Sequence, residues 1–157
     1  MNLSQKHNKY HFILICLIAL FYSLSGSADQ FEILSTKGLV ELSKDQKDWK
    51  VVSPPQKIVS GTWIRTGPSA SVALVLPNKT QTRIAKNSEL FLKSKKKKSE
   101  VKLKLGKLWS KTNKKPVELK INAPNAVASI RGTEWVIEVD DKGESSVAVM
   151  EGEIQLA

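Results

Sequence analysis

From Phe31 onward, apolar side chains recur at every second position in short runs, and Gly, Pro, Asn and Ser interrupt these runs. A period of two residues is typical of a strand with one buried face, whereas an amphipathic helix repeats its apolar residues about every 3.6 positions. No stretch of the chain keeps the helical repeat over the length of a helix. The sequence therefore predicts an all-β domain.

The predicted strands are short and follow one another at intervals of about 8 to 12 residues, which fits a β-sandwich, a barrel or a short solenoid-like coil of strands. We expect them at residues 31–34, 38–42, 49–52, 62–65, 71–76, 80–84, 89–92, 101–105, 117–121, 126–130, 133–139, 145–150 and 154–156.

Two segments between predicted strands have the residues of tight turns. Residues 76–80 contain Pro77 and Asn78, and residues 140–144 contain Gly143. These residue types suit turn dihedrals, so both segments predict antiparallel hairpins. In the second hairpin, Trp135 alternates with acidic residues and is expected in the core. We expect the same of the remaining tryptophans, Trp49, Trp63 and Trp109.

The first 28 residues have the three parts of an export signal. Lys6 and Lys9 precede an unbroken apolar run, Phe12–Tyr22, and small residues follow at 25–28. Eleven apolar residues fall short of the roughly 20 that span a bilayer as a helix. We therefore expect cleavage near Ala28 and an exported domain at residues 29–157, periplasmic or otherwise extracytoplasmic. The alternative is an uncleaved N-terminal anchor.

Removal of this segment would leave a domain without the commonest catalytic side chains. Cys16, His7 and His11 are the only cysteine and histidines of the chain, and all three lie within the signal segment. A Ser-His-Asp triad, a Cys-His nucleophile and a conventional zinc site all need these groups. We expect no enzyme, no metal and no cofactor, and no disulfide in the mature domain.

Carboxylate pairs are the remaining catalytic option. The pairs Glu134 with Glu138 and Asp140 with Asp141 are predicted on the outer face of a strand and at a hairpin tip. Nothing excludes water or perturbs a pKa at such positions, so we do not expect them to be catalytic.

The positive charge is concentrated in one segment. Residues 93–120 contain 12 lysines and only two acidic residues. One interpretation is a solvated loop that blunts a sheet edge, and the other is a docking face for anionic lipid, lipopolysaccharide or wall polymer. We do not expect nucleic acid as a partner, because Trp109 is the only aromatic residue near the lysines that could stack on bases. The candidate polyanion-binding residues are Lys93, Lys95, Lys96, Lys97, Lys98, Lys102 and Lys104.

Three stretches together resemble the FecR domain family, named for the periplasmic part of iron-dicitrate signal regulators. They are "SGTWIRTGPSASVALVLPNKTQTRIAKNSELFL", "NAPNAVASIRGTEWVIEV" and "SSVAVMEGEIQL". The resemblance covers roughly residues 31–156 and implies a FecR-type all-β domain. The sequence departs from the family pattern at Thr62, at the Asn78-Lys79 turn and at Ala123. The motif residues are Gly61, Arg65, Thr66, Gly67, Pro124, Arg131, Gly132, Thr133, Glu151 and Gly152.

We expect structural roles for these motif residues. Gly132 suits a bulge or tight bend at the entry to a strand, and Arg131 would then bond nearby carbonyls or a carboxylate such as Glu134, Glu151 or Glu153. The alternative is a ligand-facing arginine. Arg65 is interpreted in the same way.

The resemblance also implies a function. Family regulators sense signals in the periplasm and restrain a sigma factor through a cytoplasmic helical segment. Eleven residues precede the apolar run here, so we do not expect the sigma-factor role to transfer. We expect an exported, non-catalytic module that binds an unknown envelope protein, and the lysine-rich electrostatic binder remains the alternative.

Overall fold

The computed structural model describes residues 30–96, 98–112 and 119–156, with the backbone alone for residues 130–133 and 152–156. These ranges form twelve strands and no helix, which confirms the all-β prediction. No helix able to cross a membrane is found in them. The strands are β1 (Gln30–Lys37), β2 (Val40–Ser43), β3 (Lys50–Val51), β4 (Gln56–Val59), β5 (Thr62–Thr66), β6 (Ser71–Val75), β7 (Gln81–Ile84), β8 (Glu89–Lys95), β9 (Lys98–Lys111), β10 (Leu119–Ala123), β11 (Ala126–Val139) and β12 (Ser145–Leu156).

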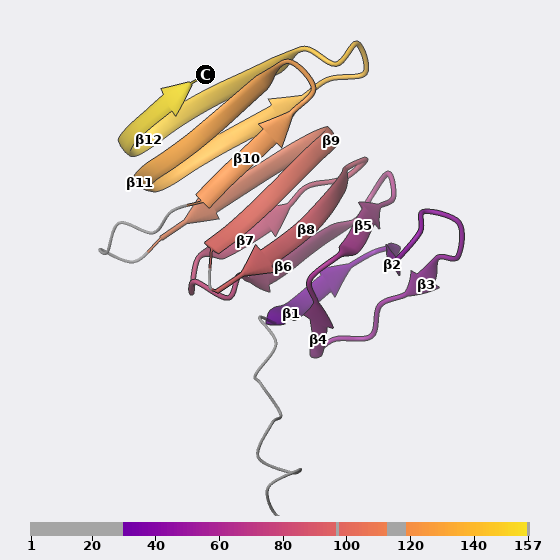
Figure 1. Cartoon of the computed structure of the whole chain (residues 1–157). Coiled ribbons are helices and arrows are strands. Elements are labelled where there is room, and N and C mark those ends of the chain that lie inside the picture. The colour runs from indigo at the N-terminus through magenta and orange to yellow at the C-terminus, as the bar shows by residue number, and fades with distance from the viewer. Residues whose placement is uncertain (1–29, 97, 113–118, 157) are drawn as a thin grey trace, which may run out of the picture.

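All twelve strands belong to one hydrogen-bonded sheet, which curls so that its two halves face each other (Figure 1). One half, here called layer A, contains β3, β2, β5, β8, the first half of β9, and β10. The other half, layer B, contains β4, β1, β6, β7 and the second half of β9. The long strands β11 and β12 follow β9 and run through both layers. The pairing is antiparallel except between β9 and β10, which are parallel.

Strand β9 passes from layer A to layer B at Gly106. Its first half pairs with β8, and its second half pairs with β7 and β11. Val101 and Leu103 are buried before the bend and Leu108 after it, so the buried positions change from odd to even. Gly106 has φ +97°, and a Cβ there would lie 2.5 Å from the Cα of Ser88. Only glycine fits a backbone that takes this conformation so close to its neighbour.

Strand β11 bends in the same way beside Gly132. Its first half pairs with β10 and its second half with β9. The register against β12 shifts between Gly132 and Glu134, and the buried positions change from Ala128 to Trp135 and Ile137. An extra residue in one strand is what lets a ladder bend sharply without losing its pairing on either side.

The core lies between the two layers and draws on both. Layer A contributes Ile64, Leu90 and Leu103, and layer B contributes Phe31 and Leu74, all at most 1% exposed. Each such side chain stabilises the fold by about 1.5 to 3 kcal/mol relative to an exposed one. One apolar cluster of this size explains how a domain without disulfides holds its fold.

The structure corrects several predicted elements. Residues 126–139 form one strand where two were expected, as do residues 145–156, and β9 is longer than predicted. Strand β4 was missed, because Pro54 and Pro55 precede it and Ile58 is its only buried residue. The turns at residues 76–80 and 140–144 do join antiparallel hairpins, as predicted.

The prediction of four core tryptophans was wrong for three of them. Trp135 is 1% exposed, whereas Trp49, Trp63 and Trp109 are only half-buried. Their rings lie over other surface side chains, with Trp49 beneath the Arg65 guanidinium and Trp63 against Phe91. A large ring with a polar N–H is well suited to a surface of this kind.

Candidate binding face

The motif residues at the end of β5 fix the place where the chain leaves layer A. The Thr66 hydroxyl donates to the carbonyl of Ala85 at 2.6 Å and accepts from the backbone N–H of Ser88 at 2.9 Å. Arg65 Nε donates to Glu41 Oε2 at 2.6 Å, and its guanidinium lies 4.1 Å from the centre of the Trp49 ring. Bonding to Glu41 raises the pKa of Arg65. These contacts tie β5 to β2 and to the start of β8.

The remaining motif residues lie at other bends and turns. The N–H of Gly61 donates to Leu92, and that of Gly67 to Leu39. Pro124 is exposed between β10 and β11. In the β11–β12 ladder, Glu151 lies opposite Glu134 and Gly132 opposite Gly152. The side chains of Arg131 and Thr133, and with them the expected contacts of Arg131, lie outside the described residues.

The structure separates the predicted lysine cluster into three groups. Lys95, Lys96 and Lys98 lie at the β8–β9 hairpin, where Lys95 lies opposite Lys98 in the strand ladder. Lys93, Lys102 and Lys104 are exposed on the outer face of layer A, together with Lys120 of β10. Lys107 and Lys111 lie on layer B, where they pair with Glu138 and Glu134. Lys97 lies outside the described residues.

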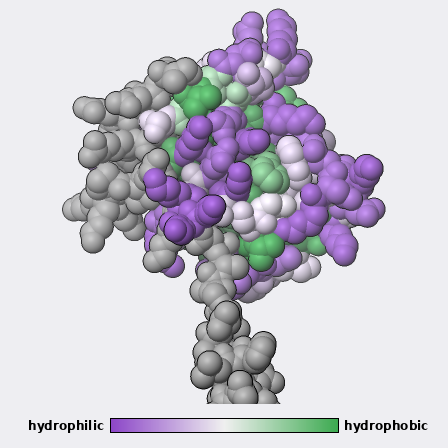
Figure 2. Space-filling view, viewed as in Figure 1, coloured by the Kyte–Doolittle hydropathy of each residue, from purple (hydrophilic) through white to green (hydrophobic). Residues whose placement is uncertain are grey.

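Pairing across four strands aligns an aromatic and basic row on the outer face of layer A. Trp63 of β5 lies opposite Phe91 of β8, Phe91 opposite Lys102 of β9, and Lys102 opposite Asn122 of β10. We call these four residues the Trp63 row. Hydrophilic residues cover most of the face seen in Figure 2, with a few apolar patches between them.

A second row runs beside the Trp63 row and adds to its charge. Lys93 lies opposite Glu100, and Glu100 opposite Lys120. Sequence analysis missed both rows, because they depend on the register between strands that are far apart in the chain. The only local sign was the alternation of lysine with apolar residues along β9.

A hollow of 470 Å³ lies along the Trp63 row. Its walls include Trp63, Lys102, Lys104, Asn122 and Pro124. The floor is backbone of layer A, since Leu103, which also lines the hollow, has its side chain in the core. The hollow is therefore a shallow surface site with mixed aromatic, cationic and amide groups.

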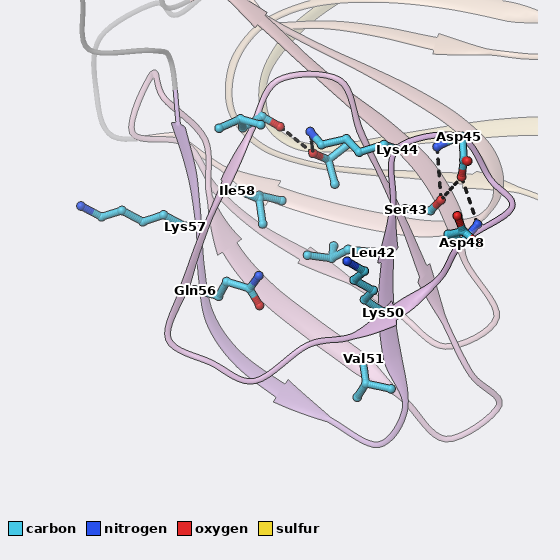
Figure 3. Close-up of a pocket in the computed structure, with 12 residues that line it drawn as sticks. Leu42, Ser43, Lys44, Asp45, Asp48, Lys50, Val51, Gln56, Lys57 and Ile58 are labelled. Carbon is cyan, nitrogen blue, oxygen red and sulfur yellow. Dashed lines mark hydrogen bonds between the residues drawn. The ribbon is translucent and has the colours of Figure 1, made fainter. Parts of the chain in front are cut away.

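A second recess, of 490 Å³, lies at the N-terminal edge between β2–β3 and β4. Leu42 and Ile58 lie close to each other within it, and Lys57 points away (Figure 3). Lys44 Nζ lies 2.7 Å from Thr62 Oγ1, and partial burial lowers the pKa of Lys44. The backbone N–H groups of Lys47 and Asp48 lower the pKa of Asp45. These bonds stabilise the β2–β3 loop and connect it to the start of β5.

Two of the four acidic residues considered for catalysis form ion pairs at the surface, and a third, Asp140, accepts the backbone N–H groups of Lys142 and Glu144 in its turn. Glu134 accepts from Lys111 Nζ at 3.0 Å and from Trp109 Nε1 at 3.1 Å, and both bonds lower its pKa. Glu138 lies 2.7 Å from Lys107 Nζ. Within the described ranges, no three His, Cys, Asp or Glu residues are grouped so that they could hold a metal ion.

Comparison with known proteins places this architecture in a family. No curated protein and no solved structure matched the chain. The family model described as FecR protein matches residues 62–155, from β5 into β12. The match covers more than half of the chain and includes both the bend after β5 and the bent strands β9, β11 and β12. The chain belongs to the FecR family, whose domains are generally non-catalytic sensor or regulator domains.

Proposed function

We propose that this chain is an exported, non-catalytic FecR-type module that works in the cell envelope by binding a protein partner. The observation that carries the proposal is the FecR match over residues 62–155. It is supported by the chemistry of the described surface, where carboxylates such as Glu134 and Glu138 are engaged by lysines. Carboxylates held in ion pairs of this kind stabilise the surface structure and are not set up to transfer a proton.

Capture of a partner from an envelope extract tests this proposal. The protein is cross-linked gently in the extract and the recovered proteins are identified, at low salt and again at about 0.5 M salt, where exposed charges interact over only a few ångströms. A Lys93→Gln/Lys102→Gln/Lys120→Gln variant serves as the control for capture by charge alone. A protein recovered equally by both forms at high salt supports the proposal. Recovery of no protein by either form contradicts it.

A second candidate function is electrostatic binding of envelope polyanions. It is favoured by the placement of Lys93, Lys102 and Lys120 on one face, with the lysines of the β8–β9 hairpin at its end. Lysine supplies point charges without the planar fork of arginine, so such binding depends on charge density and weakens with salt.

Two sets of lysines can be tested separately against lipopolysaccharide and anionic vesicles. One variant neutralises Lys95, Lys96 and Lys98 at the hairpin, and the other neutralises Lys93, Lys102 and Lys120 on the face. We expect binding at low salt that is lost at high salt, with the face variant the weaker binder. Unchanged affinity in both variants would exclude the polyanion function.

A further inference from the structure

We propose that the Trp63 row and its hollow bind a glycan that carries phosphate groups. This inference rests on the second candidate function and narrows it, because it names a site and a ligand class. Its starting point is the coincidence, in one shallow recess, of the Trp63 ring, which packs on Phe91, a cation, and a hydrogen-bonded amide and carboxylate.

The aromatic pair provides a surface for a sugar ring. The Trp63 and Phe91 rings have centroids 5.0 Å apart and are tilted by 45°. Both side chains are half-buried on the outer face of layer A, directly across the β5–β8 ladder from each other. The pair stabilises the two strands, but it also leaves ring surface at the hollow that Trp63 lines. The C–H face of a pyranose is apolar and flat and suits such a surface.

The polar groups of the hollow suit the rest of a sugar. Asn122 Nδ2 donates to Glu100 Oε1 at 2.6 Å, and both side chains line the hollow. The carboxylate and the amide oxygen keep free lone pairs, and the amide keeps a second N–H. Sugar hydroxyl groups need donors and acceptors together, and this pair supplies both.

Lys102 provides the charge for an anionic substituent. Its side chain is exposed between Phe91 and Asn122, and its ammonium group has no hydrogen bond or ion pair within the described residues. Its neighbour Lys104 is held by Glu89, with Nζ 2.9 Å from Oε1. Lys93 and Lys120 in the adjacent row extend the positive charge. A phosphate on the glycan is an anion that these ammonium groups can bind through charge-assisted hydrogen bonds.

The same features disfavour two other polyanions. A nucleic acid strand needs a continuous positive track for its regularly spaced phosphates, whereas Glu89 and Glu100 interrupt the lysines here. A bilayer surface needs protruding apolar side chains that enter the acyl region, whereas both aromatic residues lie partly buried in the sheet face.

Calorimetric titration of the whole protein with four probes tests the proposal. The probes are a delipidated, phosphorylated oligosaccharide from lipopolysaccharide, the same oligosaccharide after dephosphorylation, phosphatidylglycerol vesicles, and a single-stranded oligonucleotide. We expect the phosphorylated oligosaccharide to bind tightest. Trp63→Ala and Lys102→Gln should each weaken its binding about tenfold, since each removes about one favourable contact.

Trp109→Ala is the matched control, because Trp109 is also half-buried on an outer face but lies on layer B. It should bind like the wild type. Thermal unfolding verifies that each variant is folded, and Lys102→Gln, at an exposed position, keeps the test valid if Trp63→Ala fails to fold. Equal binding of vesicles or oligonucleotide, unaffected by the substitutions, would overturn the inference and leave the polyanion function standing. Binding of none of the four probes would overturn both.

Discussion

Two buried threonines have opposite hydrogen-bonding environments. Thr66 is 6% exposed, and its hydroxyl satisfies the carbonyl of Ala85 and the N–H of Ser88. Thr80 is fully buried, and its hydroxyl has no partner in the part of the chain that the structure describes. A buried hydroxyl stabilises a fold only when it is bonded, so the two positions make a matched pair.

Replacement of each by valine, which keeps the shape of threonine, separates these roles. We expect Thr66→Val to lower the free energy of unfolding by about 2 to 4 kcal/mol, because it removes the partner of the buried N–H of Ser88 and of the partly buried carbonyl of Ala85. Thr80→Val should stay within about 0.5 kcal/mol of the wild type or exceed it. Urea unfolding followed by fluorescence measures both, and equal losses would show that the Thr66 bonds do not hold the bend.

Glu134 makes the folding stability of the protein depend on pH in the acid range. Lys111 and Trp109 lower its pKa in the folded state. Its contribution is therefore complete above the ordinary pKa of an unfolded glutamate and is lost as the pH falls through the lowered folded-state pKa. We expect Glu134→Gln to be less stable than the wild type at neutral pH, with the difference shrinking through this acid window. Melting temperatures across the window provide the check, and a difference that is independent of pH would contradict the assignment.

At the scale of elements, the bend in β9 and the turn between β4 and β5 each contain a glycine, and the two glycines differ in their surroundings. Gly106 and Gly61 both have positive φ, +97° and +81°. A Cβ on Gly106 would overlap Ser88, whereas a Cβ on Gly61 would meet nothing within 4 Å. A side chain would therefore strain the backbone at both positions, but it would clash with neighbouring atoms only at Gly106.

Alanine substitution at both glycines tests whether the bend in β9 is sterically fixed. Gly61→Ala should cost about 1 kcal/mol, the usual penalty of an L-residue in this region. Gly106→Ala should cost about 3 kcal/mol or more, because backbone and Ser88 must both move. Chemical unfolding compares them, and similar costs would mean that the corner adapts easily.

The elements that were predicted well are those whose signals are local. Strands β5 and β6 show strict alternation, and the turn at residues 76–80 contains its own turn residues. The bends were mistaken for breaks, because a bulge such as that beside Gly132 shifts the alternation by one residue and looks like the end of a strand. The Trp63 row was not predictable, since an apolar ring on an outward face has the same sequence pattern as one in the core. Its position depends on long-range register.

At the scale of the whole molecule, the proposed export and cleavage would determine which side chains the working domain possesses. If residues 1–28 are removed, the remaining chain has no cysteine and no histidine. Mass spectrometry of the extracytoplasmic fraction should find a chain that begins at residue 29. An intact chain recovered from the cytosol would contradict this expectation.

The chain crosses between the two layers at several bends, here called corners, and consecutive corners lie next to one another. Near one corner, the N–H of Gly67 bonds to Leu39 and the N–H of Asn87 bonds to Gly67, and Gly106 packs against Ser88 in the next corner along. Two consecutive strands joined at a corner thus contact mainly the two strands of the preceding corner, as neighbouring units do in repeat proteins. Such an architecture can gain or lose a terminal hairpin in evolution while the interior it leaves behind stays intact, so domain length and surface chemistry are free to diverge together.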